Sequence, residues 1–495
     1  MIPFEEFYKN YGLKTYPFTT FTTELEKEKA KELFVPMTEF GPIIEAFNDK
    51  TSMIILGERG VGKTAVLEEF NRKINKHRVF TVINEFSRFS IIPTSEEIYN
   101  HIIQSLTIAF VRYLKKHPIK SALINKRNKI FLSYLVYYYS NEVTINLIKE
   151  TIEKLQISLP VRILSKIYNI IRKPLNYAGT VLESGIKRYI AQNFNMVPFY
   201  DERQIHEYFP ELILTSDKSF KDRESSLKII KELSSIVILT TKYKPIVLFD
   251  KLDEDSRLNN DAEIIGNFIM PILTDNYLLS LDSLQTILFI WKTPYRYIED
   301  KVRSQKYYCP TLKWNNKDLE VVLNKRLNVY SENNQIVCRT LFNRLSDDEY
   351  DDIFEISNGI PRDLWHLINK IFEEQNKINP NQNTFCIESV NQAKTRFVVE
   401  FNYYEYYPRK STSRADSMDI YSYYAHLLKV GESTFSKNML SEKAKTGSST
   451  SNYVAGMERI GLIERIHQER GEIFYRIKDK KIIYALNNKL DIRNK

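Results

Sequence analysis

Four apolar runs in the first 300 residues have the pattern of buried β-strands. Three of them, SMIIL (52–56), IVLF (246–249) and LQTILFIW (284–291), contain few polar residues. Such runs are typical of parallel sheets, whose two faces are both covered by helices. The fourth run, VFTVINEF (79–86), alternates weakly between apolar and polar positions. Because helical spacing of apolar residues follows the first run, the pattern predicts an α/β core with a doubly wound parallel sheet.

The rest of the chain predicts helices and one further small domain. Apolar residues recur at helical spacing in residues 316–330 and 356–375, which predicts a helical segment over residues 313–405. Turn and linker residues, YYPRKSTSRADS (406–417), come next. Three helical patterns and the hairpin pattern ERGEIFYRIKD then predict a winged helix-turn-helix domain over residues 418–495.

Residues 105–215 separate the second predicted strand from the third and exceed what a minimal core needs. They read as mainly helical and basic: residues 101–200 hold 15 Lys and Arg against 4 Asp and Glu, a net charge of +11. Tyrosines are interleaved with the basic residues, which fits a nucleic-acid groove, a membrane-surface helix, or a helical subdomain whose aromatic residues form its core. The predicted core is therefore split into residues 1–104, which include an N-terminal lead-in, and 216–312.

Charge and cysteine content indicate the kind of partner and the compartment of the protein. The chain of 495 residues carries a net charge of +9, and its last part, residues 409–495, holds 17 Lys and Arg against 10 Asp and Glu. Two basic segments favour an anionic partner such as DNA, although solvated surfaces are the simpler alternative. Three cysteines without paired spacing, a polar N-terminus and no apolar run near the ~18 residues of a membrane span predict a cytoplasmic protein without disulfides or a zinc site.

The segment GERGVGKT joins the first predicted strand to a helix, which is the context of a phosphate-binding loop. Its glycines let backbone N–H groups turn inward, and the helix N-terminus favours negative charge. We expect Lys63 to reach the β- and γ-phosphates of a nucleotide and the hydroxyl of Thr64 to ligate Mg²⁺. The predicted nucleotide-binding residues are Gly57, Glu58, Arg59, Gly60, Val61, Gly62, Lys63, Thr64 and Ala65.

Polar residues at the ends of the other strands complete this site. Asp250 closes the IVLF strand, where a carboxylate faces the phosphates and can hold Mg²⁺ through water. Asp253 and Glu254 follow, and one of them could orient or deprotonate the attacking water, unless the loop is merely solvated. Lys292 and Thr293 directly follow the third apolar run. One of them could lie beside the expected γ-phosphate, or the two could form an ordinary strand end.

Arg362, in NGIPRDLWHLINK, opens a predicted helix of the segment 313–405. A positive charge is unfavourable at a helix N-terminus, so its position indicates that a phosphate compensates for it.

The order of these motifs over roughly residues 30–380 resembles that of AAA+ and STAND-type P-loop ATPases. The form DKLDE is similar to the second carboxylate motif of STAND proteins, and GIPR with a leucine-rich helix looks like the sensor 2 element of an AAA+ lid. Archaeal origin-recognition initiators share that lid and carry a winged helix after it, and defence-associated P-loop ATPases of bacteria are also similar. The resemblance implies ATP and Mg²⁺ as ligands.

The resemblance also implies roles for individual residues. Glu254, or less plausibly Asp253, would be the catalytic carboxylate, and Arg362 the sensor 2 residue. Arg303, in DKVRSQ, lies where many AAA+ proteins place an arginine finger. The sensor 1 position falls on Lys292 or Thr293, where a small polar residue is usual. Lys251 stands where AAA+ proteins carry a glutamate next to the Mg²⁺ aspartate, so a slow ATPase switch is favoured over a fast motor.

The third helix of the predicted winged helix would be its recognition helix. Its N-terminal end would face DNA bases, and basic residues nearby would contact phosphates. The alternative is a winged helix used for packing or protein contacts. The predicted DNA-binding residues are Lys445, Ser448, Thr450, Ser451, Asn452 and Arg470.

Three functions are consistent with these patterns. The first is an ATP-dependent switch that binds DNA in genome maintenance, a mobile element or phage defence. The second is a STAND-like signalling ATPase that senses a protein trigger and recruits a separate effector or operon partner. The third is a structural nucleotide binder without turnover. ATP binding could also drive homo-oligomer formation in each case.

Overall fold

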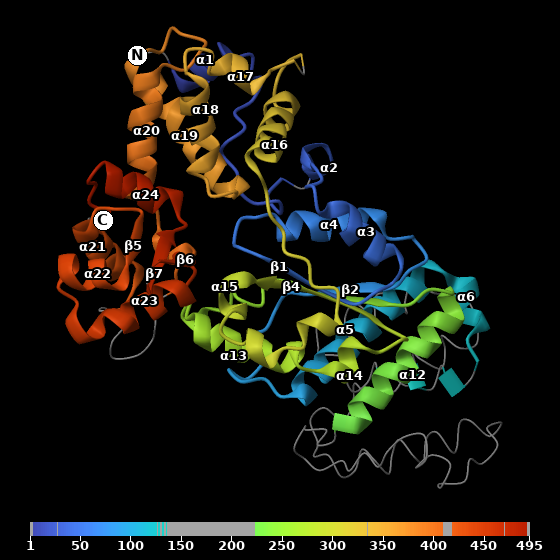
Figure 1. Ribbon diagram of the computed structural model, residues 1–495. Coiled ribbons are helices and arrows are strands. Elements are labelled where there is room, and N and C mark those ends of the chain that lie inside the picture. Colours follow the sequence, from blue (N-terminus) through green and yellow to red (C-terminus); the bar gives the residue numbers. More distant parts are fainter. Residues whose placement is uncertain are drawn as a thin grey trace, which may run out of the picture.

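The computed structural model describes residues 3–26, 28–125, 127–128, 131–132, 135, 223–333, 335–408, 418–469 and 471–492. Figure 1 shows an α/β core next to a helical lid and a C-terminal domain. None of the helices in these ranges is long and apolar enough to cross a membrane. Most of the predicted insertion, residues 409–417 of the predicted linker, and Arg470 lie outside the described residues.

A parallel four-stranded sheet forms the centre of the core. It contains β1 (Met53–Gly57), β2 (Phe80–Ile83), β3 (Ile246–Phe249) and β4 (Gln285–Trp291) in the order β1-β4-β3-β2. Gly57 pairs with Trp291, and Ile83 pairs with Phe249, so the carboxyl ends of the strands lie at one edge. Every residue of β1, β3 and β4 is buried, which explains why these strands read as continuous apolar runs.

Helices cover both faces of the sheet, as Figure 1 shows. On one face, α3 (Phe40–Asn48) and α4 (Lys63–Lys73) pack on alternate strand residues such as Ile55 and Leu248. On the other face, the intervening residues, including Ile54 and Val247, pack on three longer helices. These helices are α5 (Ser95–Lys116), α12 (Arg223–Thr241) and α13 (Ala262–Leu273), with α6 (Pro118–Leu123), α14 (Asn276–Leu279) and α15 (Lys292–Tyr295) as short additions. The predicted doubly wound sheet is confirmed.

The helix α5 changes the boundary predicted for the insertion. It begins at a capping box formed by Thr94 and Glu97 and continues without a break through residue 105. Its buried residues, among them Ile102 and Phe110, belong to the same hydrophobic cluster as the sheet. The boundary predicted at residue 105 therefore lies inside a core helix, because the buried apolar residues of α5, from Ile98 to Tyr113, belong to the same cluster as the sheet.

Five helices form the lid: α16 (Asn316–Val329), α17 (Cys338–Leu341), α18 (Asp347–Glu355), α19 (Pro361–Ile378) and α20 (Ile387–Glu400). The N-terminal segment, with α1 (Phe4–Lys9) and α2 (Ala30–Leu33), also belongs to this part of the molecule. Phe7, Tyr11 and Phe18 surround Phe372 of α19 at ring-centroid distances of 6.2, 5.1 and 5.9 Å. The lead-in predicted as part of the core thus packs on the lid.

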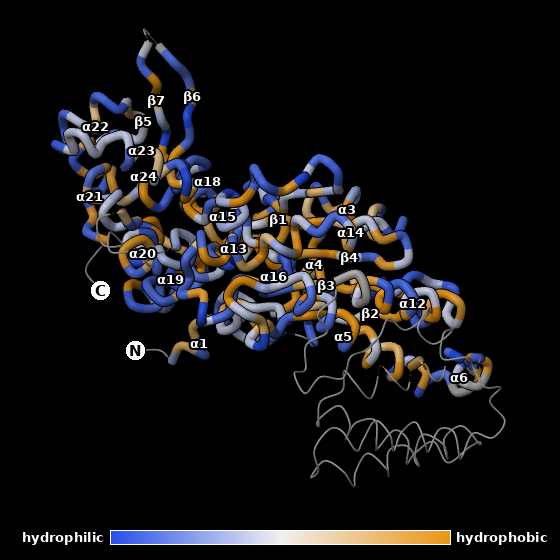
Figure 2. The backbone as a smooth tube through the Cα atoms, turned by 90° about the horizontal axis from the view of Figure 1, so that it is seen from below, coloured by the Kyte–Doolittle hydropathy of each residue, from blue (hydrophilic) through white to orange (hydrophobic). Residues whose placement is uncertain are grey.

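The C-terminal domain has the helices and hairpin predicted for a winged helix. Its elements are α21 (Ile420–Val430), β5 (Thr434–Ser436), α22 (Lys437–Ala444), α23 (Thr450–Arg459), β6 (Ile463–Glu469), β7 (Glu472–Ile477) and α24 (Lys480–Asn487). The strands form an antiparallel sheet in the order β5-β7-β6. Figure 2 shows the β6–β7 hairpin projecting from the rest of the domain, as a wing does.

The lid and the C-terminal domain share one hydrophobic core. A single cluster of buried residues runs from the N-terminal segment through α16–α20 to α21–α24, whereas the residues of the sheet belong to two other clusters. A buried ion pair crosses the same boundary, since Lys481 Nζ of α24 lies 2.8 Å from Asp363 Oδ2 of α19. We call the N-terminal segment, lid and C-terminal domain together the lid body. Its shared core predicts that it moves as one unit relative to the α/β core.

Candidate nucleotide-binding site

The loop between β1 and α4 requires glycine at several positions. Gly60 and Gly62 have φ angles of 76° and 103°, in the left-handed region that favours glycine. A Cβ atom at Gly57 would lie 2.7 Å from Val61 Cγ1, and one at Gly60 would lie 2.9 Å from Arg362 Cβ. The glycines therefore allow both the tight turn and the close approach of the lid to the loop.

Lys63 is the first residue of α4 and points into the loop. Its Nζ donates hydrogen bonds to the carbonyl oxygens of Gly57 (3.0 Å) and Glu58 (3.1 Å). Burial lowers the pKa of Lys63, while the nearby carboxylates of Asp253, Glu58 and Asp250 act in the opposite direction. The ammonium group therefore lies where a phosphate oxygen could replace the loop carbonyls as its partner.

Thr64 and Asp250 meet at the carboxyl end of β3. Thr64 Oγ1 donates to Asp250 Oδ2 at 3.2 Å, and the backbone N–H of Asp250 donates to Ile83 O at 3.0 Å. Burial raises the pKa of Asp250 to about 6, partly offset by Lys63. Hydroxyl and carboxylate oxygens are the hard ligands that Mg²⁺ prefers, so the residues present fit a magnesium ion.

Glu58 connects the loop to the end of β4. Its carboxylate accepts hydrogen bonds from Trp291 Nε1 (2.9 Å) and Thr293 Oγ1 (3.1 Å), and Arg296 Nη2 lies 3.4 Å away. Thr293 is therefore engaged with the loop itself, while Lys292 is half-buried and burial lowers its pKa. Of the two sensor 1 candidates, Lys292 is the one without a bond to Glu58 in the described structure.

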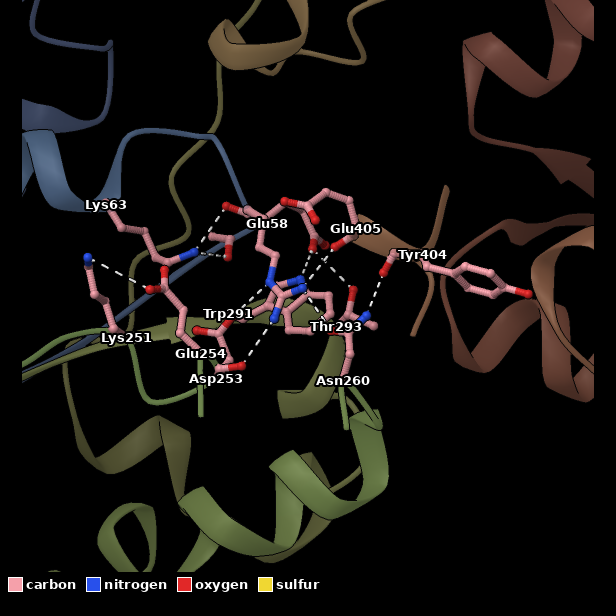
Figure 3. Close-up of polar contacts among 12 residues, drawn as sticks. Glu58, Lys63, Lys251, Asp253, Glu254, Asn260, Trp291, Thr293, Tyr404 and Glu405 are labelled. Carbon is pink, nitrogen blue, oxygen red and sulfur yellow. Dashed lines mark hydrogen bonds and ion pairs between the residues drawn. The ribbon is translucent and has the colours of Figure 1, made fainter. Parts of the chain in front are cut away.

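The two candidate catalytic carboxylates lie in different surroundings, as Figure 3 shows. Asp253 is buried and bound to Arg59, with 2.8 Å between its Oδ2 and Arg59 Nε. Glu254 is 59% exposed, and its Oε2 lies 3.7 Å from Lys251 Nζ. Lys251 in turn lies 2.9 Å from Glu24 of the lid body. Because its carboxylate is exposed, Glu254 is the one that water can reach.

Arg362 lies at the edge of the lid that faces the phosphate loop. It is the second residue of α19, and its Cβ is the atom that a side chain at Gly60 would meet first. Arg362 Nη1 lies 3.8 Å from Glu405 Oε1, and its buried Nε has no hydrogen-bond partner among the described residues. A buried donor without a partner is costly, and the phosphate of a nucleotide would supply one.

Arg303 does not join this group in the described structure. It is exposed just before the short 3₁₀ helix Ser304–Lys306, and its electrostatic neighbour is Tyr307, whose hydroxyl donates to Asn276 of α14. The role of an arginine finger acting on a second copy of the chain remains a prediction.

The C-terminal domain exposes most of the predicted DNA-binding residues. Lys445, Ser448, Ser451 and Asn452 are exposed around the start of α23. Thr450 is different: it is buried, and its hydroxyl donates to Gly447 O at 2.7 Å. It therefore holds the turn before α23, because its side chain points inward from the first turn of the helix.

Several contacts of this site are not visible in sequence motifs. Trp314 Nε1 of the lid donates to Val61 O in the loop at 2.8 Å, and Trp291 stacks on Arg59. The only feature of the sequence that could point to these contacts is the position of Trp291 at the end of an apolar run. Asn260 and Tyr404, which link Arg59 and the core to the lid, carry no such signal.

Comparisons with known proteins do not assign the chain to a family. No protein-family model matches the sequence, and no curated protein matches it. The crystal structure of Cdc6p from Pyrobaculum aerophilum is similar at 10% sequence identity and a TM-score of 0.28, over 97% of this chain and 98% of that chain.

Proposed function

We propose that this protein is an ATP-binding switch with slow, Mg²⁺-dependent ATP hydrolysis. The observation that carries the proposal is the meeting of Lys63, Thr64 and Asp250 at one end of the sheet, where a glycine-rich loop begins a helix. This combination provides a cation for phosphate oxygens and two oxygen ligands for a metal ion.

Each residue has a separate task in this proposal. The loop and Lys63 bind the phosphates, and Thr64 and Asp250 hold Mg²⁺, which neutralises charge on the phosphate oxygens when bound. Glu254 orients the attacking water or accepts its proton, because its carboxylate is exposed beside the site. Arg362 joins the phosphates from the lid, since its Nε is buried without a partner among the described residues.

The proposed partner of the C-terminal domain is duplex DNA. The segment 409–495 has a net charge of +7, and the exposed residues at the start of α23 are small and polar next to Lys445. Small polar side chains at the beginning of a recognition helix suit base contacts, while lysine suits phosphates. Because this domain belongs to the lid body, movement of the lid would reorient the DNA-binding surface.

The test is steady-state ATP hydrolysis by the full chain at low salt, with and without duplex DNA. We expect slow basal turnover that DNA stimulates and that rising salt suppresses, because phosphate contacts release counterions. Lys445→Ala should reduce the salt dependence of DNA binding by about one phosphate contact, with a slope change of roughly 0.9. Turnover that is indifferent to DNA would contradict DNA binding as the trigger and favour a protein-triggered switch. No turnover under any condition would contradict the enzymatic part.

A further inference from the structure

Arg59, inside the phosphate loop, contacts three other parts of the molecule. Its Nε donates to Asp253 Oδ2 at 2.8 Å, and its Nη2 donates to Asp253 O at 3.1 Å. Its Nη1 donates to Asn260 Oδ1 at 2.8 Å and to Glu405 O at 3.3 Å. The guanidinium also stacks 3.8 Å above the ring of Trp291 at the end of β4. Every guanidinium nitrogen therefore has a hydrogen-bond partner. Figure 3 shows the contacted residues Asp253, Asn260, Trp291 and Glu405 grouped together.

Asn260 strengthens the same connection from the core side. Its Nδ2 donates to Tyr404 O at 2.6 Å, next to the carbonyl group that Arg59 binds. Tyr404 and Glu405 lie in the short 3₁₀ helix Tyr403–Glu405, which follows α20 of the lid. Tyr403 of that helix is fully buried within the hydrophobic cluster of the lid body. A displacement of residues 403–405 therefore carries the lid body with it.

We propose that Arg59 couples the nucleotide site to the lid body. In this inference, which rests on the proposed function, Arg59 is a positioning residue that fixes Asp253 and holds residues 404–405 against the core. Any nucleotide-dependent shift of the loop changes the position of Arg59 and so changes the hydrogen bonds to Glu405 O and, through Asn260, to Tyr404 O. The position of the C-terminal domain then follows the nucleotide.

The chemistry of the contacts explains why arginine occupies this loop position. The fork of N–H groups meets a carboxylate, an amide oxygen and two backbone carbonyl groups together, which a lysine ammonium cannot reproduce. The side chains of Arg59 and Asp253 are only 15% and 8% exposed, so water competes weakly for these bonds. Asp253 serves here as the anchor of Arg59, which leaves the reaction itself to Glu254.

The test compares hydrogen–deuterium exchange of residues 403–408 in the full chain, with and without ATPγS, alongside the Kd for that nucleotide. In the wild type we expect nucleotide to change exchange in residues 403–408 as well as in the phosphate loop. Asn260→Ala should keep the Kd within about twofold, yet exchange in 403–408 should become roughly two- to tenfold faster and lose its response to nucleotide. Arg59→Lys should show the same loss of response and a larger fall in kcat than in nucleotide affinity.

Thr38→Ala is the matched control, because Thr38 Oγ1 also joins the core to the lid, at 3.0 Å from Asp318 Oδ2, but does not touch the phosphate loop. It should leave the response of residues 403–408 intact. An unchanged response in both Asn260→Ala and Arg59→Lys, with nucleotide still bound, would overturn the coupling while leaving the proposed function in place. A wild-type chain that binds no nucleotide would overturn both.

Discussion

The buried pair of Lys481 and Asp363 gives the sharpest prediction about the lid body. Both residues are at most 1% exposed, and Asp363 also accepts a hydrogen bond from Tyr406 at 2.6 Å. Burial opposes the charge on Lys481, but the carboxylates of Asp363 and Asp479 hold its pKa above the usual range. Lys481→Met keeps most of the side-chain volume and removes the charge, which leaves Asp363 buried with one donor from Tyr406.

The expected cost of Lys481→Met is about 3–5 kcal/mol, the usual effect of leaving one member of a buried pair uncompensated. The double variant Lys481→Met/Asp363→Asn removes both charges of the closer pair and keeps an acceptor for Tyr406. The second carboxylate near Lys481, Asp479, keeps its hydrogen bonds from Asn358, Tyr407 and the backbone of α24, so the double variant should cost only about 1 kcal/mol. Lys480→Met is the matched control, because the adjacent Lys480 pairs with Glu355 at 2.6 Å with both side chains over 40% exposed. Its expected cost is below about 1 kcal/mol.

Native-state hydrogen exchange of α19 and α24 measures these costs locally, which suits a chain with several domains. In Lys481→Met, both helices should lose protection together, because they share one core. A cost below about 1 kcal/mol, or a loss confined to α24, would refute the idea that the lid and the C-terminal domain form a single unit.

Three further predictions concern the nucleotide site. Glu254→Gln should keep nucleotide binding and lose turnover in a steady-state assay, and full activity would shift the catalytic role to Asp253. Because burial raises the pKa of Asp250 to about 6, its protonation should weaken Mg²⁺-dependent nucleotide binding as the pH falls through 6, in titrations from pH 8 to 5. Asp250→Asn should bind nucleotide weakly at every pH, and a variant with the same pH profile as the wild type would exclude Asp250 as the Mg²⁺ ligand. Gly60→Ala should weaken nucleotide binding at least tenfold in a fluorescent-nucleotide titration, because residue 60 has a φ of 76° and the added Cβ would lie 2.9 Å from Arg362 Cβ. Gly471→Ala is the control: it has a φ of 85° but open space around it, and it should not alter binding.

The strands and the glycine-rich turn between β1 and α4 could be predicted because their signals are local. Ile54 and Ile55 of β1 are buried on opposite faces of the sheet, and this produces a continuous apolar run that can be recognised in the sequence alone. The glycines of the loop and Asp250 at the end of β3 follow directly from such strands. The order of helices and hairpin in the C-terminal domain can be predicted for the same reason, since its turns and helices alternate over short distances.

Contacts between distant segments could not be predicted in this way. Arg59 and Asp253 are 194 positions apart, and Lys481 and Asp363 are 118 positions apart, so no spacing rule connects them. The sequence predicts that a polar residue at the start of a helix is exposed. Thr450 is buried instead, because its orientation depends on how α23 packs. The lead-in is predicted as part of the core, whereas its aromatic residues find their partners on α19, far away in the sequence.

The proposed function depends on binding of ATP with Mg²⁺ by the loop of residues 57–64. The decisive measurement is isothermal titration of the full chain with ATPγS and Mg²⁺, with Lys63→Ala as the comparison and circular dichroism to confirm that the variant is folded. We expect saturable binding of one nucleotide by the wild type and a loss of at least a hundredfold in affinity, about 2.7 kcal/mol, in Lys63→Ala. Equal affinity of the two proteins would contradict the site assignment, and no binding by the wild type would contradict the proposed function.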